Sequence, residues 1–169
     1  MTERIQENTP LLRLELKRAD AAELVSSDRT LAGSAFVRAL GSRASEVLAK
    51  GTVRRYPDRV IVFQQNDEGT SLFLVLAGEA RLYARKHSDT VELGVAHKGD
   101  VLGEAEVLSG CCSRQSSVIA QGQLDLVELS REALMPGRAL TSALQAALGE
   151  IHRDRSAKLD EMTDFLNRW

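Results

Sequence analysis

A series of short β-prone segments between Gly51 and Ser130 constrains the fold of this chain more than any other feature. Apolar residues recur there with a period of two, and turn-forming residues separate the segments at regular intervals. The sequence predicts strands at 53–56, 60–63, 72–77, 80–84, 91–96, 116–120 and 124–129. We expect Gly78 to turn a hairpin between the third and fourth of these segments, and Gln121-Gly122 to join the last two. Many short strands with regular turns are typical of a β-sandwich or a β-barrel.

A helical pattern precedes this β-rich region. Apolar residues at helical spacing predict one amphipathic helix from Ala35 to Ala49, which Gly51 ends. Asp28 or Ser34 can cap it. A shorter helix is expected at 18–25, whereas the alternating leucines before it fit either a strand or a helix.

A second helical region follows the strands. Ser130 is a good N-cap for a short helix, which Pro136-Gly137 interrupts. From Arg138 to Trp169 the apolar residues follow one long helical pattern, and a polar stretch around 152–155 interrupts it. This helix either packs on the strands or forms a homodimer with a second copy.

Composition excludes several classes of function. The 169 residues carry a formal net charge of −2, which provides no basic field for nucleic acid or for an anionic membrane. No apolar run approaches the ~20 residues that span a bilayer, and the polar N-terminus does not resemble a signal peptide. We therefore expect a cytoplasmic protein without nucleic acid or membrane partners. The adjacent Cys111 and Cys112 and three scattered histidines predict neither a disulfide nor a metal site.

The segment from Gly99 to Val118 contains the residues that suggest ligand chemistry. Gly103 opens a helical turn, whose free backbone N–H groups can bind an anion. Arg114 returns ten residues after Glu104 and offers a fork of donors to the same anion. An ionised Glu104 only accepts hydrogen bonds and suits a sugar hydroxyl. Together these groups describe a pocket for a sugar phosphate. No nucleophile, base and orienting group converge, so we do not expect an enzyme.

The pattern GD-x-x-GE, followed by Arg114 at this spacing, resembles the phosphate-binding cassette of cyclic nucleotide-binding domains, in particular the ligand domain of catabolite activator-type regulators. The similarity continues through 72–80 and 127–130 and covers roughly residues 35 to 135. It implies a mainly β fold with flanking α-helices: a β jelly-roll barrel with N-terminal helices and a long C-terminal helix. The implied divisions are an N-terminal extension (1–33), the β-barrel domain (34–135) and the C-terminal helix (136–169), with no DNA-binding domain. Asn66 stands where the family usually has glycine, and asparagine tolerates positive φ.

The resemblance also implies roles for individual residues. Glu104 would accept from the ribose 2′-hydroxyl, and Arg114, at the mouth of the pocket, would bind the cyclic phosphate. Backbone N–H groups of the cassette and the region of Ser116 would complete the phosphate site, and the C-terminal helix would cover the base near 152–156. The predicted ligand-binding residues are Gly103, Glu104, Ala105, Glu106, Arg114, Gln115 and Ser116. The predicted regulatory ligand is cAMP, with cGMP as the less favoured alternative.

Two residues depart from the family pattern. Glu106 lies where a small residue is usual, and a carboxylate about 4 Å from a phosphodiester costs several kcal/mol at an effective dielectric constant near 20. Glu106 is compatible with a nucleotide if its side chain points outward. If it pairs instead with Arg114, the pocket satisfies itself. Gln115 favours neither cAMP nor cGMP.

Two functions follow from these observations. The first is a stand-alone cyclic nucleotide-binding regulatory protein that signals through an unidentified partner protein. The second is a degenerate cyclic nucleotide-binding fold that acts as a protein-interaction adaptor without nucleotide. Gly103, Glu104 and Arg114 favour the first, and Glu106 and Gln115 favour the second.

Overall fold

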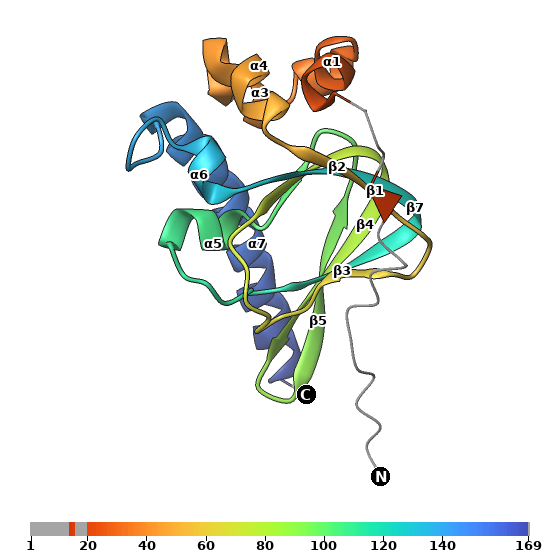
Figure 1. Cartoon of the computed structure of the whole chain (residues 1–169). Helices are drawn as coiled ribbons and strands as arrows, with labels where there is room; N and C mark the ends of the chain where they lie inside the picture. The colour runs from red at the N-terminus through yellow and green to blue at the C-terminus, as the bar shows by residue number, and fades with distance from the viewer. Residues whose placement is uncertain (1–13, 16–19, 169) are drawn as a thin grey trace.

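The computed structural model describes residues 14–15 and 20–168. Helices cover one end and one side of an antiparallel sheet (Figure 1). The strands are β1 (Leu14–Glu15), β2 (Thr52–Tyr56), β3 (Ile61–Phe63), β4 (Leu72–Lys86), β5 (Asp89–Ala96), β6 (Val101–Leu102) and β7 (Ser117–Leu129). The helices are α1 (Ala21–Ser26), α2 (Arg29–Ala32), α3 (Ala35–Leu40), α4 (Ala44–Ala49), α5 (Glu104–Ser109), α6 (Arg131–Leu134) and α7 (Ser142–Leu166), with a 3₁₀ turn η1 (Gly41–Arg43) between α3 and α4.

The sheet is built around the long antiparallel pair β4 and β7. Its order is β1-β2-β7-β4-β5, with β3 also paired to β7 and β6 to β4. The predicted jelly-roll fold with N-terminal helices and a long C-terminal helix is confirmed. The sheet is not closed into a complete barrel, because no ladder joins β5 to β1 within the described residues.

The predicted hairpin turns at Gly78 and Gly122 are wrong. Each lies inside one long strand, β4 or β7, and the pairing register of these strands shifts around residues 75–79. Gly78 has a φ of 83°, and a Cβ atom there would lie 2.1 Å from the carbonyl oxygen of Gln123. The two backbones therefore touch at a bulge, where a glycine lets the strand bend without ending.

The helix predicted from Ala35 to Ala49 is broken. Gly41, with a φ of 59°, ends α3, and the chain re-forms a helix as α4 after the 3₁₀ turn. Ser34 caps α3 through the backbone N–H of Val37, whereas Asp28 caps the separate helix α2. The helix expected at 18–25 is α1, and residues 18–19 lie outside the described range. Asn66 adopts the expected positive φ, 73°.

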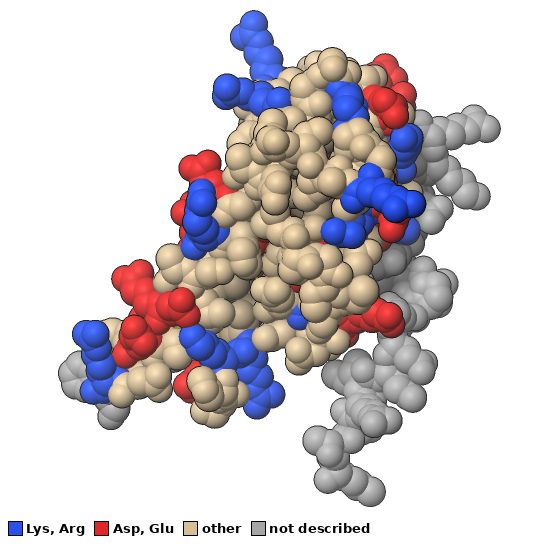
Figure 2. Space-filling model, turned by 90° about the vertical axis from the view of Figure 1, so that its left-hand side faces the viewer, with Lys and Arg blue, Asp and Glu red and all other residues tan. Residues whose placement is uncertain are grey.

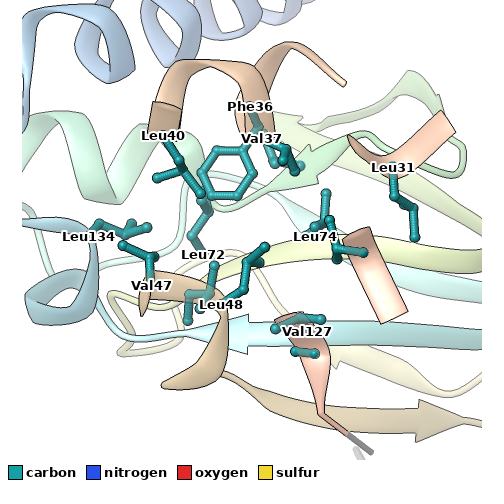
Figure 3. Close-up of a cluster of buried hydrophobic side chains, with 14 of the residues drawn as sticks. Leu31, Phe36, Val37, Leu40, Val47, Leu48, Leu72, Leu74, Val127 and Leu134 are labelled. Atoms are coloured by element: carbon teal, nitrogen blue, oxygen red, sulfur yellow. The ribbon is translucent and has the colours of Figure 1, made fainter. Parts of the chain in front are cut away.

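The N-terminal helices and α7 share a core with one face of the sheet. Figure 3 shows the cluster in which Phe36 and Leu40 of α3, Leu48 of α4 and Leu72 and Leu74 of β4 pack together. Full burial of each such side chain contributes about 1.5–3 kcal/mol. A second cluster fills the inside of the bent sheet, around Tyr56, Phe63, Phe73, Leu82 and Val118.

Helix α7 is anchored unevenly along its length. Its first half buries Leu144 and Leu148 completely in the shared core. From Ile151 onward Thr163 is the one buried residue among those described. The second half lies along β5 (Figure 1) and is held by polar contacts, such as the ion pair of 2.7 Å between Lys86 and Asp160. Among the described segments, no helix has both the length and the apolar character needed to cross a bilayer.

Candidate ligand-binding site

Gly103 sets the geometry at the start of the cassette. It precedes α5 with a φ of 81°, in the left-handed region that favours glycine. A Cβ atom at this position would lie 2.6 Å from Nη1 of Arg114 and 2.6 Å from the carbonyl oxygen of Ser71. A glycine is therefore required here both by the backbone angle and by the close approach of the arginine.

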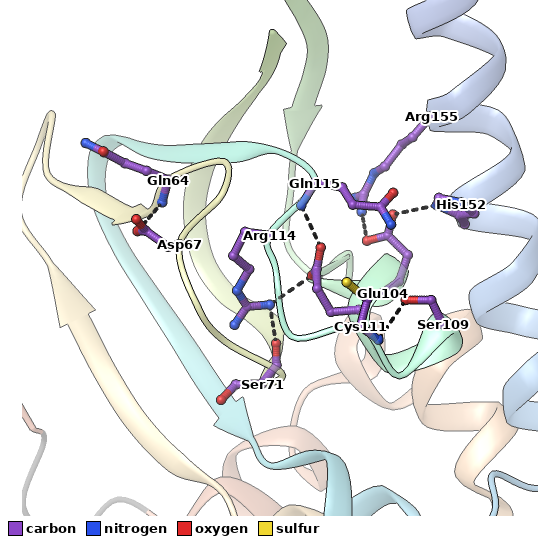
Figure 4. A network of polar contacts seen from close by, with 11 residues as sticks. Gln64, Asp67, Ser71, Glu104, Ser109, Cys111, Arg114, Gln115, His152 and Arg155 are labelled. Carbon is purple, nitrogen blue, oxygen red and sulfur yellow. Dashed lines mark hydrogen bonds and ion pairs between the residues drawn. The ribbon is translucent and has the colours of Figure 1, made fainter. Parts of the chain in front are cut away.

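Glu106 and Arg114 form a buried ion pair. Oε2 of Glu106 accepts from Nη1 of Arg114 at 3.0 Å (Figure 4), and the two side chains are 2% and 4% exposed. Glu106 therefore points inward, toward the guanidinium predicted to bind the cyclic phosphate. The expected pairing of Glu106 with Arg114, rather than an outward orientation, is the one the structure contains.

The remaining contacts of Arg114 hold its guanidinium inside the protein. Nη1 also donates to the carbonyl oxygen of Ser71 at 2.8 Å. The guanidinium carbon lies 4.3 Å from the centre of the Phe63 ring and 5.6 Å from that of Phe73, within cation–π range. The expectation that Arg114 lies at a pocket mouth, apart from the core, is wrong. Its guanidinium contacts two aromatic rings of the inner cluster.

The second oxygen of Glu106 is also engaged. Oε1 accepts from the backbone N–H of Gln115 at 2.8 Å (Figure 4), while the Gln115 side chain is exposed and Ser116 is half-buried. One carboxylate thus binds the guanidinium and a backbone N–H of the loop. The sequence predicted that a phosphate would accept hydrogen bonds from the guanidinium and from backbone N–H groups of the cassette. The carboxylate of Glu106 accepts such bonds instead.

Glu104 binds the C-terminal helix. The carboxylate, 5% exposed, pairs with Nη1 of Arg155, whose Nη2 donates to the carbonyl oxygen of Val101 at 2.7 Å. Nδ1 of His152 lies 3.8 Å from Oε1 of Glu104 on the same face of α7. Figure 4 shows both α7 side chains directed at the cassette. The predicted hydroxyl acceptor is therefore occupied by an arginine of the same chain.

The contact between Glu104 and α7 shifts the pKa values of Glu104 and His152. Burial raises the pKa of Glu104, but the neighbouring imidazole and the positive charge of Arg155 outweigh it, so the pKa lies below its ordinary value. The Glu104 carboxylate raises the pKa of His152; desolvation and the charge of Arg155 oppose this, and Glu106 adds to it. Both shifts favour the charged pair of Glu104 and His152.

These shifts predict a pH window for the α7 contact. A raised His152 pKa stabilises the fold fully below the ordinary value of about 6.5, and that contribution is lost as pH rises through the folded-state pKa. A lowered Glu104 pKa stabilises above about 4.5 and is lost as pH falls through its folded-state value. The contact is therefore expected to be strongest between about pH 4.5 and 6.5.

Urea unfolding of the parent and of His152→Gln tests this window. Between about pH 6 and pH 8 the parent is expected to lose more stability than the variant, because glutamine carries no charge to lose. Parallel pH profiles of the two proteins would show that His152 does not stabilise the contact through its charge.

The predicted site residues thus fall into two groups. Glu106, Arg114 and the backbone of Gln115 are in mutual contact. Gly103, immediately before α5, and Ala105, in its first turn, lie beside them. Glu104 belongs to a second contact, with α7. The sequence did not identify Ser71 as a partner of Arg114, and a backbone carbonyl leaves no signal in a sequence. Arg155 and His152 fall in the polar interruption of α7, the stretch expected to cover the cassette.

The fold and the cassette define a class of protein. Residues 53–136 match the family model of the cyclic nucleotide-binding domain, and through them the chain belongs to that family. Within the described residues, no group of three histidine, cysteine, aspartate or glutamate side chains is placed to hold a metal ion.

Known proteins resemble this chain in sequence or in fold at modest sequence identity. The CRP-like protein Clp of Xanthomonas campestris is 31% identical over 88 residues, which cover 52% of this chain and 38% of the relative. The cAMP-bound regulatory domain of protein kinase A from Toxoplasma gondii superposes with a TM-score of 0.64 at 18% identity, over 79% of this chain and 50% of that one. A cyclic nucleotide-binding domain from Methylobacillus flagellatus has a TM-score of 0.61 at 15% identity, over 96% of this chain and 87% of that one.

Proposed function

We propose that this chain is a regulatory, non-enzymatic domain that acts on a partner protein without a bound cyclic nucleotide. The buried pair of Glu106 and Arg114 carries the proposal, because it gives the cassette arginine an anion of its own. The second pair, between Glu104 and Arg155, holds α7 against the cassette. The two contacts together keep cassette and helix joined in the absence of ligand.

A nucleotide would have to compete with both contacts. Its phosphate would displace Glu106 from Arg114 and leave a buried carboxylate beside a second anion. The repulsion amounts to several kcal/mol at about 4 Å and an effective dielectric constant near 20. Its ribose would displace Arg155 from Glu104, and that guanidinium would lose a charge-assisted hydrogen bond. Adenine and guanine derivatives face the same cost, because it arises at the phosphate and ribose.

The second candidate is a cyclic nucleotide sensor, with cAMP favoured over cGMP. The left-handed Gly103 and the α7 side chains directed at the cassette support it, because the family resemblance implies a glycine at this turn and a helix that covers the base. In this case the ligand would replace Glu106 and Arg155 at their partners and shift α7.

Calorimetric titration of the full chain with cAMP, cGMP and cyclic di-GMP separates the two. The proposed function predicts no binding tighter than about millimolar, which corresponds to roughly −4 kcal/mol. Micromolar binding of any of the three would favour the sensor. Circular dichroism and a melting curve of the same sample show that the protein is folded.

Two features of the surface bear on where a partner protein would bind. Acidic and basic side chains are interspersed on the face shown in Figure 2, so this face has no field of one sign. The end of α7 exposes Met162, Phe165 and Leu166, which suits a second copy or a partner protein. Homodimerisation through α7 and the boundaries of the domain at 34 and 135 stay predictions.

A further inference from the structure

A cavity lies on the side of the sheet that faces away from the inner core cluster. Val62, Leu82 and Val118 point into that cluster. Their sequence neighbours in β3, β4 and β7, namely Ile61, Tyr83 and Ile119, line the cavity instead. Successive side chains along a strand point to opposite faces of the sheet. Its volume of about 780 Å³ is within the range of small-molecule sites. No cassette residue from Gly103 to Gln115 contributes to its lining.

Hydrogen bonds join the segments that form the wall of the cavity. The side chain of Gln65 forms two hydrogen bonds with the backbone of Arg85 in β4. Its Oε1 accepts from the Arg85 N–H at 2.6 Å, and its Nε2 donates to the Arg85 carbonyl oxygen at 3.0 Å. The backbone N–H of Gln65 donates to Oγ of Ser117 at 2.9 Å. Three separate segments of chain are thus fixed together around the opening.

The charge of the lining has one sign. Among the residues that the structure describes, it contains Arg85 and His87, several neutral amide and hydroxyl side chains, and no aspartate or glutamate. No ion pair joins the Arg85 guanidinium to any other residue of the described chain. Arg81, four residues earlier on the same strand, hydrogen-bonds Gln121 and lies 3.9 Å from Glu92. Arg85 is therefore the cation available to a bound anion.

We propose that this cavity is a second ligand site, separate from the cassette, for a small organic anion with an apolar body. The body lies on Ile61, Ile119 and the ring of Tyr83, and the anionic group pairs with the guanidinium of Arg85. The amides of Gln64 and Asn66 supply further polar contacts at the rim. This proposal does not depend on whether the cassette binds a nucleotide.

The fluorescent aromatic sulfonate 8-anilinonaphthalene-1-sulfonate is a suitable probe, since it joins an anion to an apolar body. We expect saturable binding to the folded full chain, weakened roughly tenfold by Arg85→Gln, the effect of one charge-assisted hydrogen bond. The matched control is Arg138→Gln, which removes the same charge from an exposed position outside the cavity lining and is expected to leave affinity unchanged. Both side chains are exposed, so both variants are expected to fold, as circular dichroism will check.

Two further results decide the proposal. The uncharged analogue N-phenyl-1-naphthylamine is expected to bind the parent and Arg85→Gln equally, because it has no anion for the guanidinium. An equal loss of sulfonate affinity in both arginine variants would overturn the site, since it would indicate only the net charge of the surface. Unchanged affinity in Arg85→Gln would overturn it as well, and would place the probe on another apolar surface such as the end of α7.

Discussion

Glu106→Ala is expected to give the protein an affinity for cyclic nucleotide that the parent lacks. The substitution removes the carboxylate that occupies Arg114 and the repulsion that it would exert on a phosphate. A freed guanidinium in a dry site forms a strong, charge-assisted contact with a phosphate. We expect the affinity for cAMP to rise by at least about a hundredfold, corresponding to roughly 3 kcal/mol. Calorimetric titration of parent and variant measures the change.

Two variants control this experiment. Glu161→Ala removes the same charge from an exposed position on α7 and is expected to leave nucleotide affinity at the level of the parent. Glu106→Gln keeps the shape of the side chain without its charge, and is expected to fall between parent and alanine variant. If folded Glu106→Ala has the same cAMP affinity as the parent, the carboxylate is not what keeps nucleotide out of the cassette.

Arg114→Ala is expected to destabilise the fold strongly, in addition to any effect on ligands. The substitution leaves the carboxylate of Glu106 buried without its cation, and removing one member of a buried ion pair typically costs about 3–5 kcal/mol. The lost packing on Phe63 adds to that cost. Urea unfolding followed by circular dichroism gives the difference in the free energy of unfolding.

The double variant Glu106→Ala, Arg114→Ala separates the ion pair from the packing. It is expected to be more stable than Arg114→Ala alone, because no uncompensated charge remains inside. A loss below about 1 kcal/mol in the single variant, the range of exposed pairs, would contradict the burial of this pair.

Most of the fold was predictable from the sequence, and the predictions that were wrong have a common physical cause. The period of two located β2, β3 and the ends of β4 and β7 correctly. Gly78 and Gly122 looked like turn residues, because a bulge inside a bent strand and a tight turn both require a glycine with positive φ. Only long-range pairing distinguishes the two. Gly41 is the opposite case. Its positive φ ends α3, whereas the helical spacing of the apolar residues around it predicted one continuous helix.

The candidate site was predictable in its parts but not in its connections. The spacing from Gly103 to Arg114 identified the cassette, and the anomaly of Glu106 raised the alternative of an internal pair. Whether that side chain turns inward depends on packing that a local pattern does not contain. The Phe63 and Phe73 rings that hold Arg114, and the reach of Arg155 from α7 to Glu104, depend on the tertiary fold.

We propose that Glu106, and not a cyclic phosphate, is the anion bound by Arg114. The side-chain ¹⁵N–¹H resonances of Arg114, assigned through Arg114→Lys, test it directly when the full chain is titrated with cAMP to about 10 mM. We expect these resonances to keep their positions throughout and to shift when Glu106→Gln removes the carboxylate charge. A progressive, saturable shift of the Arg114 resonances by cAMP in the parent would show that the phosphate displaces Glu106, and would contradict the claim.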